Sequence, residues 1–204
     1  MNFLIKSGQG LKGEITIPGD KSISHRSIIL SSLAEGTSKI HGLLEGEDCL
    51  ATIEVFRNMG IKIINEEGVY SIEGNGLRGL DAPQKPLDFG NSGTSIRLCS
   101  GILSAQNFQS TLVGDSSLSS RPMQRIVEPL TDMGAKITSN NGTLPLNISP
   151  TDSLKSIDYL LPVASAQVKS CIMLAALYAE GVTKIEEGAV TRDHTENMFK
   201  QFGI

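Results

Sequence analysis

The chain has 204 residues, of which 39% are hydrophobic and 20% are charged, and its formal net charge is −4. A chain of this length and composition can bury a substantial core, which argues against an intrinsically disordered protein. The negative charge argues against a general nucleic-acid binder, which would more often be basic, whereas a small anionic substrate needs only local positive charge.

The spacing of the cysteines and the lengths of the apolar segments indicate the cellular compartment. Cys49, Cys99 and Cys171 are far apart and form no Cys-x-x-Cys pair, which is typical of core thiols in a reducing compartment and argues against a disulfide framework or a zinc site. No signal peptide is expected, because Lys6 interrupts the short apolar start. The longest helical apolar run, residues 171–179, is too short to cross a bilayer. We therefore expect a cytoplasmic protein with no membrane or nucleic-acid partner.

The first predicted elements enclose a polar cluster. Residues 13–17 alternate and are β-branched, which predicts a strand, and residues 28–34 are apolar and predict a helix. The segment between them carries cationic and hydroxyl side chains: Lys21, Ser22, Ser24, His25 and Arg26. Unpaired N–H groups and the positive end of the helix dipole suit an anion at such a junction. For one such turn alone, the alternative is an ordinary helix cap with its charges in solvent.

The rest of the chain repeats this pattern. Residues 28–40 and 171–185 both read as a helix ending in Ala-Glu-Gly and then a short strand with Thr and Lys, and residues 96–112 have the same shape. A glycine that stops a helix before a strand recurs as Gly60, Gly134 and Gly203. The repeating unit is therefore strand, helix, strand, helix and a pair of strands, about every 70 residues.

The closing strand pairs predict hairpins in the first two units. One hairpin joins residues 61–64 to 69–73, and the other joins residues 136–138 to 144–148. The third unit stops at Ile204 before its closing strands, so we expect a chain that is cut inside this unit. The predicted fold class is α/β, of the α+β type, with units over residues 13–80, 81–150 and 151–204.

Each unit places a polar turn before its first helix. These turns are Asp20-Lys21-Ser22, Gly90-Asn91-Ser92-Gly93-Thr94 and Ser165-Ala166-Gln167. If the units are stacked in a common direction, three helix N-termini converge on one face and form a strong site for phosphate or carboxylate. Arg121 and Arg192 fall at nearly equivalent places before the second helices, where a guanidinium can bind either anion through two parallel hydrogen bonds.

The histidines suggest chemistry only weakly. His25 and His194 are candidates for acid–base catalysis, but each taken singly is more often structural, and His41 receives no role. The sequence has no Gly-x-Gly-x-x-Gly motif, no P-loop and no metal-ligand spacing. We therefore expect a site that binds and orients anions without a metal, a cofactor or a covalent nucleophile.

Four further positions receive structural interpretations. Asp48 is expected to cap its helix, and Pro122 fits a first helical position. Lys169 is expected in solvent on the first helix of the third unit. Arg97, one turn after Gly93, is expected in an ion pair rather than on a ligand.

Four motifs resemble those of the 5-enolpyruvylshikimate-3-phosphate synthases, the enolpyruvyl transferases of the shikimate pathway. They are Pro18 to Arg26 (PGDKSISHR), Gly90 to Arg97 (GNSGTSIR), Ser120 to Met123 (SRPM) and Ala164 to Ser170 (ASAQVKS). The resemblance runs from Met1 to Ile204 and implies the N-terminal half of a chain about twice as long.

The resemblance implies a fold of two domains, each with three βαβαββ units around a pseudo-threefold axis, in an inverse α/β barrel-like arrangement. Residues 13–204 would be the first domain with its third unit truncated, and residues 1–12 would be a strand segment that belongs with the absent second domain. The parent protein would be a monomer.

The resemblance also implies the substrates, shikimate 3-phosphate and phosphoenolpyruvate, with no cofactor. Shikimate 3-phosphate would be held by Lys21, Ser22, Arg26, Ser165, Ala166, Gln167 and, as a weaker candidate, Arg192. Phosphoenolpyruvate would be held by Lys21, Gly93, Arg121 and Gln167. Lys21 would orient the substrates, and the proton-accepting Asp would lie in the missing half, so the chain alone is expected to be inactive.

One local departure and two alternatives accompany the resemblance. Some members have Ser-Ser-Gln where this chain has Ser165-Ala166-Gln167, which resembles a bacterial branch with glyphosate-tolerant members. The sister transferase acting on UDP-N-acetylglucosamine carries Asn after the first Lys and a reactive Cys, whereas here Ser22 follows Lys21 and residues 115–121 contain no Cys. The other alternative is a non-catalytic anion-binding or assembly module of the same fold.

Overall fold

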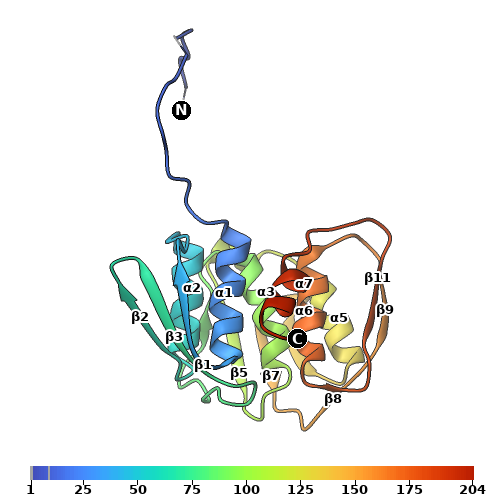
Figure 1. Ribbon diagram of the computed structural model, residues 1–204. Helices are drawn as coiled ribbons and strands as arrows, with labels where there is room; N and C mark the ends of the chain where they lie inside the picture. The colour runs from blue at the N-terminus through green and yellow to red at the C-terminus, as the bar shows by residue number, and fades with distance from the viewer. Residues whose placement is uncertain (1, 9) are drawn as a thin grey trace.

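Three helices lie side by side at the centre of the molecule. The computed structural model describes residues 2–8 and 10–204. The central helices are the first helices of the three repeats: α1 (Lys21–Leu33), α3 (Gly93–Leu103) and α6 (Ala166–Ala176) (Figure 1). Three further helices pack beside them: α2 (Glu47–Arg57), α5 (Gln124–Asp132) and α7 (His194–Gln201). The short helix α4 (Ser116–Ser119) lies against the strand β7 (Thr143–Ser149).

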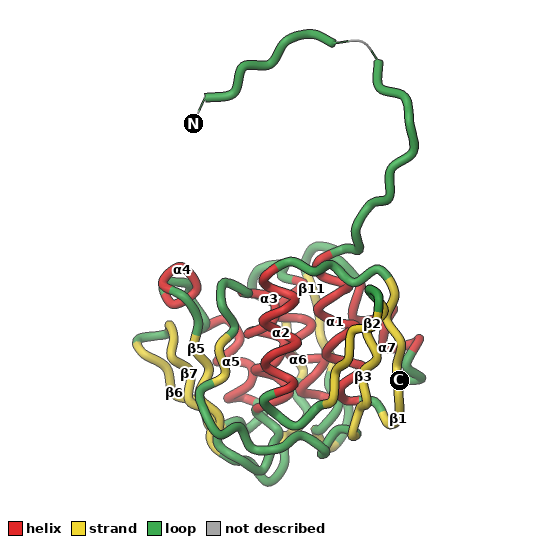
Figure 2. The backbone as a smooth tube through the Cα atoms, turned by 90° about the vertical axis from the view of Figure 1, so that its left-hand side faces the viewer, coloured by secondary structure: helices red, strands yellow, loops and turns green. Residues whose placement is uncertain are grey.

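Sheets cover this helical centre on several sides, as Figure 2 shows. The first unit has an antiparallel sheet in the order β1-β3-β2, made of β1 (Glu35–His41), β2 (Lys62–Glu66) and β3 (Val69–Asn75). The second unit has the order β4-β5-β7-β6, made of β4 (Leu87–Asp88), β5 (Ser110–Val113), β6 (Lys136–Asn140) and β7 (Thr143–Ser149). In this second sheet β4 runs parallel to β5 and the other pairs are antiparallel.

The third unit contains two parallel strand pairs. Strand β8 (Leu154–Lys155) pairs with β10 (Ala179–Glu180), and β9 (Asp158–Leu161) pairs with β11 (Lys184–Glu187). Parallel pairs need a crossover, and α6 provides it for both. The β9–α6–β11 arrangement matches β4–α3–β5 of the second unit, which confirms the predicted repeat.

The two predicted hairpins are confirmed, and the turn chemistry explains them. Their two-residue turns are Glu67-Gly68 and Asn141-Gly142, and all four residues have positive φ. Positive φ at both central positions is the geometry that lets a short turn follow the twist of two antiparallel strands. The glycines expected to stop helices, Gly60, Gly134 and Gly203, also have positive φ.

The strand expected over residues 13–17 is wrong. The backbone there has no strand assignment, and Ile15 and Ile17 are 86% and 78% exposed. A strand needs a partner, and residues 13–17 lie in a segment that runs away from the body of the molecule (Figures 1 and 2). The assignment of residues 1–12 to a second domain stays a prediction, and Met1 and Gln9 lie outside the described residues.

The central helices approach one another closely because small residues line the faces through which they touch. A Cβ added at Gly101 on α3 would clash with the carbonyl oxygen of Cys171 on α6, so backbone packs against backbone there. Buried serines satisfy their own hydroxyls by donating to the carbonyl four residues earlier, as Ser100 does to Ile96. This packing fixes the relative positions of the helix N-termini, and thereby the site.

The three cysteines are buried in the core, as the sequence predicts. Burial raises the pKa of the Cys49 thiol to about 11 and that of the Cys99 thiol to about 12. Among the described residues, no helix is both long enough and apolar enough to span a membrane.

Candidate functional site

The three central helices begin in the same way. At each N-terminus a side-chain oxygen accepts a hydrogen bond from the backbone N–H three residues later: Asp20 from Ile23, Ser92 from Ser95 and Ser165 from Val168. Such caps satisfy only one of the first backbone N–H groups of each helix. Asp20 is therefore a cap, as the structural alternative for this turn predicts, but the caps leave the dipole ends available to a ligand.

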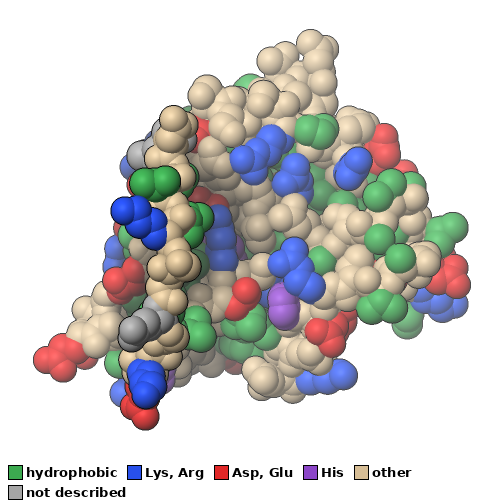
Figure 3. All heavy atoms as spheres, turned by 90° about the horizontal axis from the view of Figure 1, so that it is seen from above, with side chains coloured by type: hydrophobic (Ala, Val, Ile, Leu, Met, Phe, Trp, Pro, Cys, Tyr) green, Lys and Arg blue, Asp and Glu red, His purple; other side chains and the backbone are tan. Residues whose placement is uncertain are grey.

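One small pocket touches all three helix starts, which confirms the expected convergence. Its lining comes from α1, α3 and α6 and from the start of α7: Ser22, Arg26, Thr94, Ala166, Gln167, Arg192 and His194. Lys and Arg side chains gather on the face seen from above in Figure 3. We call this pocket the helix-start pocket.

Arg26 is the buried cation of the helix-start pocket. Its Nε donates to Thr195 Oγ1 at 2.6 Å, its Nη2 to Ser170 Oγ at 2.7 Å and its Nη1 to the carbonyl of Ser22 at 3.0 Å. These bonds join α1 to α6 and α7, and two of the five guanidinium N–H groups have no acceptor among the residues that the structure describes. Burial and the nearby Arg192 guanidinium lower the pKa of Arg26 to about 10, so it remains a cation at neutral pH.

Lys21 and Arg192 approach the pocket from its rim. Arg192 donates from Nη1 to Ser22 Oγ at 3.3 Å across the boundary between the first and third units. Lys21 is half exposed, and its ammonium pairs with the carboxylate of Asp48. The prediction that Asp48 caps its helix is wrong, because Gly46 occupies the N-cap position and Asp48 instead neutralises Lys21.

Gly93 lies against two guanidinium groups. A Cβ at this position would lie 2.8 Å from Arg97 Nη1 and 3.0 Å from Arg121 Nη1. Arg121 is oriented by Asn91, whose Oδ1 accepts from Nη2 at 2.6 Å. The expectation that Pro122 is a first helical residue is wrong, because α5 begins at Gln124 and its N-cap is Met123.

The sequence reasoning missed that Arg97 and Thr94 orient Gln167. Arg97 Nη1 donates to Gln167 Oε1 at 3.0 Å, and Gln167 Nε2 donates to Thr94 Oγ1 at 2.9 Å. The ion pair expected for Arg97 is wrong: no carboxylate among the described residues lies within salt-bridge distance, and its other acceptors are the carbonyls of Gly93 and Pro122. The spacing of Arg97 one turn after Gly93 was the available signal, since it puts both on one helix face.

The two candidate histidines differ in access. His25 is fully buried, with Nδ1 2.8 Å from Thr52 Oγ1 and Nε2 3.4 Å from Ser92 Oγ. Burial lowers its pKa to about 4, so it is neutral and sealed from solvent, in agreement with the structural interpretation. His194 is the first residue of α7 and lines the helix-start pocket.

Lys169 is not in solvent, contrary to expectation. Its side chain is 8% exposed, and its ammonium lies between Glu187 and Glu196. Two carboxylates from neighbouring elements explain how a lysine is buried at this position, since a buried charge must be paired.

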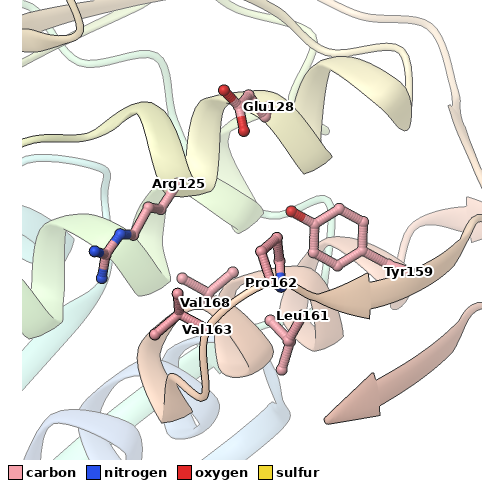
Figure 4. A pocket seen from close by; sticks show the side chains of 7 residues that line it. All are labelled: Arg125, Glu128, Tyr159, Leu161, Pro162, Val163 and Val168. Carbon is pink, nitrogen blue, oxygen red and sulfur yellow. The ribbon is translucent and has the colours of Figure 1, made fainter. Parts of the chain in front are cut away.

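A second hollow lies apart from the helix-start pocket, between α5 and the junction of β9 with α6 (Figure 4). Its side chains are Arg125, Glu128, Tyr159, Leu161, Pro162, Val163 and Val168. Its floor is apolar, and it includes none of the residues predicted for substrate binding. The anion chemistry is therefore concentrated at the helix starts.

Comparison with known proteins identifies the family. A model of the EPSP synthase (3-phosphoshikimate 1-carboxyvinyltransferase) family matches residues 5–204. The chain belongs to the EPSP synthase family. It is 60% identical over 201 residues to the 3-phosphoshikimate 1-carboxyvinyltransferase of Ruthia magnifica, covering 98% of this chain and 46% of that relative. It is 55% identical over 205 residues to that of Hydrogenovibrio crunogenus, covering 100% of this chain and 46% of the relative.

A solved structure agrees with the fold. The EPSP synthase of Acinetobacter baumannii superposes with a TM-score of 0.91 at 55% identity, covering 94% of this chain and 44% of that one. The predicted enolpyruvyl transferase fold, with its repeated units, is therefore confirmed. The chain spans about half the length of the EPSP synthases that it matches.

Proposed function

We propose that this chain forms one wall of the active site of a 3-phosphoshikimate 1-carboxyvinyltransferase. The complete enzyme would transfer the enolpyruvyl group of phosphoenolpyruvate to the 5-hydroxyl of shikimate 3-phosphate and release phosphate. The observation that carries the proposal is the helix-start pocket, where three helix N-termini meet Arg26 and Arg192. Family membership supports the choice of reaction.

The shikimate 3-phosphate end of the site would be the helix-start pocket. Its phosphate would be bound by Ser165 and the backbone of Ala166 at the start of α6, and by the rim cations. Its ring would contact Ser22 and Arg26, with Arg192 as a further ligand and Lys21 at the edge toward the second substrate. Two N–H groups of Arg26 and the first N–H groups of α6 before Val168 have no acceptor among the described residues. They are suited to this task, because charge-assisted hydrogen bonds to an anion are the strong ones.

The phosphoenolpyruvate end would lie over the first turn of α3. Gly93 leaves room there, and the adjacent guanidinium of Arg121 is held by Asn91. Gln167 would contact both substrates, because Arg97 and Thr94 fix its amide between the two ends. Two polyanions repel each other in water, so clustered cations and helix dipoles lower the cost of bringing them together.

In this proposal, the 5-hydroxyl loses its proton and adds to C2 of phosphoenolpyruvate while C3 is protonated to a methyl group. The tetrahedral intermediate then loses a proton from this methyl group and expels phosphate, which restores the carbon–carbon double bond of the enolpyruvyl group. Lys21 orients the substrates rather than serving as the base, and the residue that accepts the proton lies outside this chain. The reaction needs no cofactor. The three buried thiols are consistent with a reducing compartment such as the cytoplasm, and we propose a monomeric parent protein.

Two alternatives stay in view. A transferase for UDP-N-acetylglucosamine is disfavoured because Ser22 follows Lys21 and residues 115–121 carry no Cys. A non-catalytic anion-binding module of the same fold would keep the pocket but lose the selectivity for two substrates.

Calorimetry with the 204-residue chain tests the proposal. We expect uptake of shikimate 3-phosphate and no phosphate release above background when both substrates are added, because the proposed base is not in this chain. Arg26→Met is expected to weaken shikimate 3-phosphate binding, whereas Lys62→Met, which removes an exposed lysine on the outer sheet, is the matched control. Uptake of neither substrate would exclude binding as the function of this chain, and measured turnover would refute the assignment of the base.

A further inference from the structure

One ammonium group joins both ends of the segment that carries Arg192. Lys169 on α6 contacts Glu187 Oε1 at 2.9 Å at the end of β11, and Glu196 Oε1 at 2.6 Å in the first turn of α7. The loop between these two glutamates runs from β11 to α7 (Figure 1). We call residues 187–196 the α7 entry segment.

Further side-chain hydrogen bonds hold the α7 entry segment on each side of Arg192. Thr191 donates from Oγ1 to Glu187 Oε2 at 2.6 Å, so the residue before Arg192 is bound to the carboxylate that Lys169 holds. Thr195, on the other side, is bonded to Arg26 and to Ser170. Among the residues that the structure describes, the 3.3 Å contact from Nη1 to Ser22 Oγ in the first unit is the only side-chain hydrogen bond of Arg192.

The positive charge of Lys169 is what holds the two glutamates of the α7 entry segment together. Burial alone would lower the pKa of Lys169, but its hydrogen bonds to Glu196 and Glu187 raise the pKa above its ordinary value, so the group is a cation. Without the ammonium, two carboxylates of like charge would face each other. Glu187 and Glu196 are 21% and 30% exposed, so both can turn into solvent, and the ends of the segment would then separate.

We propose that Lys169 is a positioning residue for the substrate site: by bridging Glu187 and Glu196 it fixes the α7 entry segment, so that Arg192 stands over the start of α1. The inference rests on the proposed function, in which Arg192 contacts the phosphorylated substrate. Lys169 does not line the helix-start pocket, so its effect on a ligand must pass through the segment that it holds.

A double-mutant cycle between Lys169 and Arg192 tests the inference. Shikimate 3-phosphate binding to the chain is measured by calorimetry for the wild type, Lys169→Met, Arg192→Ala and the double variant. We expect Lys169→Met to weaken binding between about 2-fold and about 100-fold, the range of coupling within one bonded network. In the Arg192→Ala background the same change should have almost no effect. Lys184→Met, on β11 with a side chain 74% exposed, is the matched control.

A second readout does not depend on the ligand. Hydrogen exchange of the backbone amides of residues 188–193 should accelerate in Lys169→Met and not in Lys184→Met. If Lys169→Met unfolds the chain, Thr191→Val removes one tie at the surface of the network and is expected to accelerate the same amides and weaken binding less than Arg192→Ala.

The outcomes separate this inference from the proposed function. Unchanged affinity in Lys169→Met, or an equal loss with and without Arg192, overturns the positioning role while the function stands. If the wild-type chain takes up no shikimate 3-phosphate, the proposed binding function of this chain fails, and the exchange rates alone decide whether Lys169 fixes the segment: accelerated amides support it, and unchanged amides overturn it.

Discussion

Replacing Gly93 by Ala probes the proposed phosphoenolpyruvate end of the site with a single methyl group. The new Cβ would lie 2.8 Å from Arg97 Nη1 and 3.0 Å from Arg121 Nη1, whereas non-bonded carbon contacts are optimal from about 3.5 Å. Both guanidinium tips must therefore move by roughly 0.5–0.7 Å. Because Gly93 opens α3 without a positive φ, the substitution adds no backbone strain.

The expected loss of affinity for phosphoenolpyruvate follows from the hydrogen bonds that the displaced guanidinium groups would weaken. A charge-assisted bond contributes about 1.5–3 kcal/mol and weakens steeply with distance and angle. A partial loss of about 1–2 kcal/mol corresponds to roughly a 5- to 30-fold weaker affinity for phosphoenolpyruvate. Shikimate 3-phosphate, proposed to lie at the other end of the pocket, should be affected much less.

The assay is steady-state kinetics with each substrate varied in turn, in a full-length protein that contains this chain, together with thermal unfolding. Gly46→Ala is the matched control, since it lies at the start of α2 and its Cβ would meet only Leu44 at an ordinary 3.8 Å. Equal losses for both substrates would refute the assignment of the phosphoenolpyruvate end. A fall in melting temperature would show that the methyl group acts on the fold rather than on the ligand.

Two further predictions concern Arg121 and His25. Arg121→Ala in a full-length protein should lower kcat/KM by orders of magnitude, since two charge-assisted bonds to an anion are worth about 1.5–3 kcal/mol each; activity near that of the wild type would remove Arg121 from the site. The pKa of His25 is lowered from 6.5 to about 4 in the folded chain, so the unfolded chain binds more protons between these two pH values. The contribution of neutral His25 to the free energy of unfolding is therefore complete above pH 6.5 and is lost as the pH falls toward 4. Chemical denaturation across this range should show up to about 3 kcal/mol of pH-dependent stability that disappears in His25→Leu, and an unchanged pH slope in that variant would contradict the assignment.

The fold could be predicted to a large extent because its signals are local. Each of the two hairpins depends on a two-residue turn, and the helix stops depend on single glycines. The prediction of a strand over residues 13–17 was wrong because an alternating side-chain pattern shows only that a segment is compatible with a strand. Strand formation also needs a neighbouring strand, and the described residues place none beside this segment. The repeat correctly indicated that three helix starts would meet.

The side-chain partners in the site could not be predicted in the same way. Lys21 pairs with Asp48, Arg97 with Gln167 and Lys169 with Glu196, and in each case the partner comes from another element. Sequence spacing predicts neighbours three or four residues apart on one helix, but it does not show which residues packing brings together. A lysine on a helix face therefore looked solvated until α7 and β11 were seen to cover it.

By itself, the sequence determined the family, the repeating unit and the presence of three capped helix starts, because motifs and caps lie within short stretches of chain. Only the tertiary structure decided that Arg26 is a buried clamp between three helices and that Lys169 holds the segment bearing Arg192. The physical reason is that a charge is stabilised by the groups around it in space, and packing of the central helices selects those groups from distant parts of the chain.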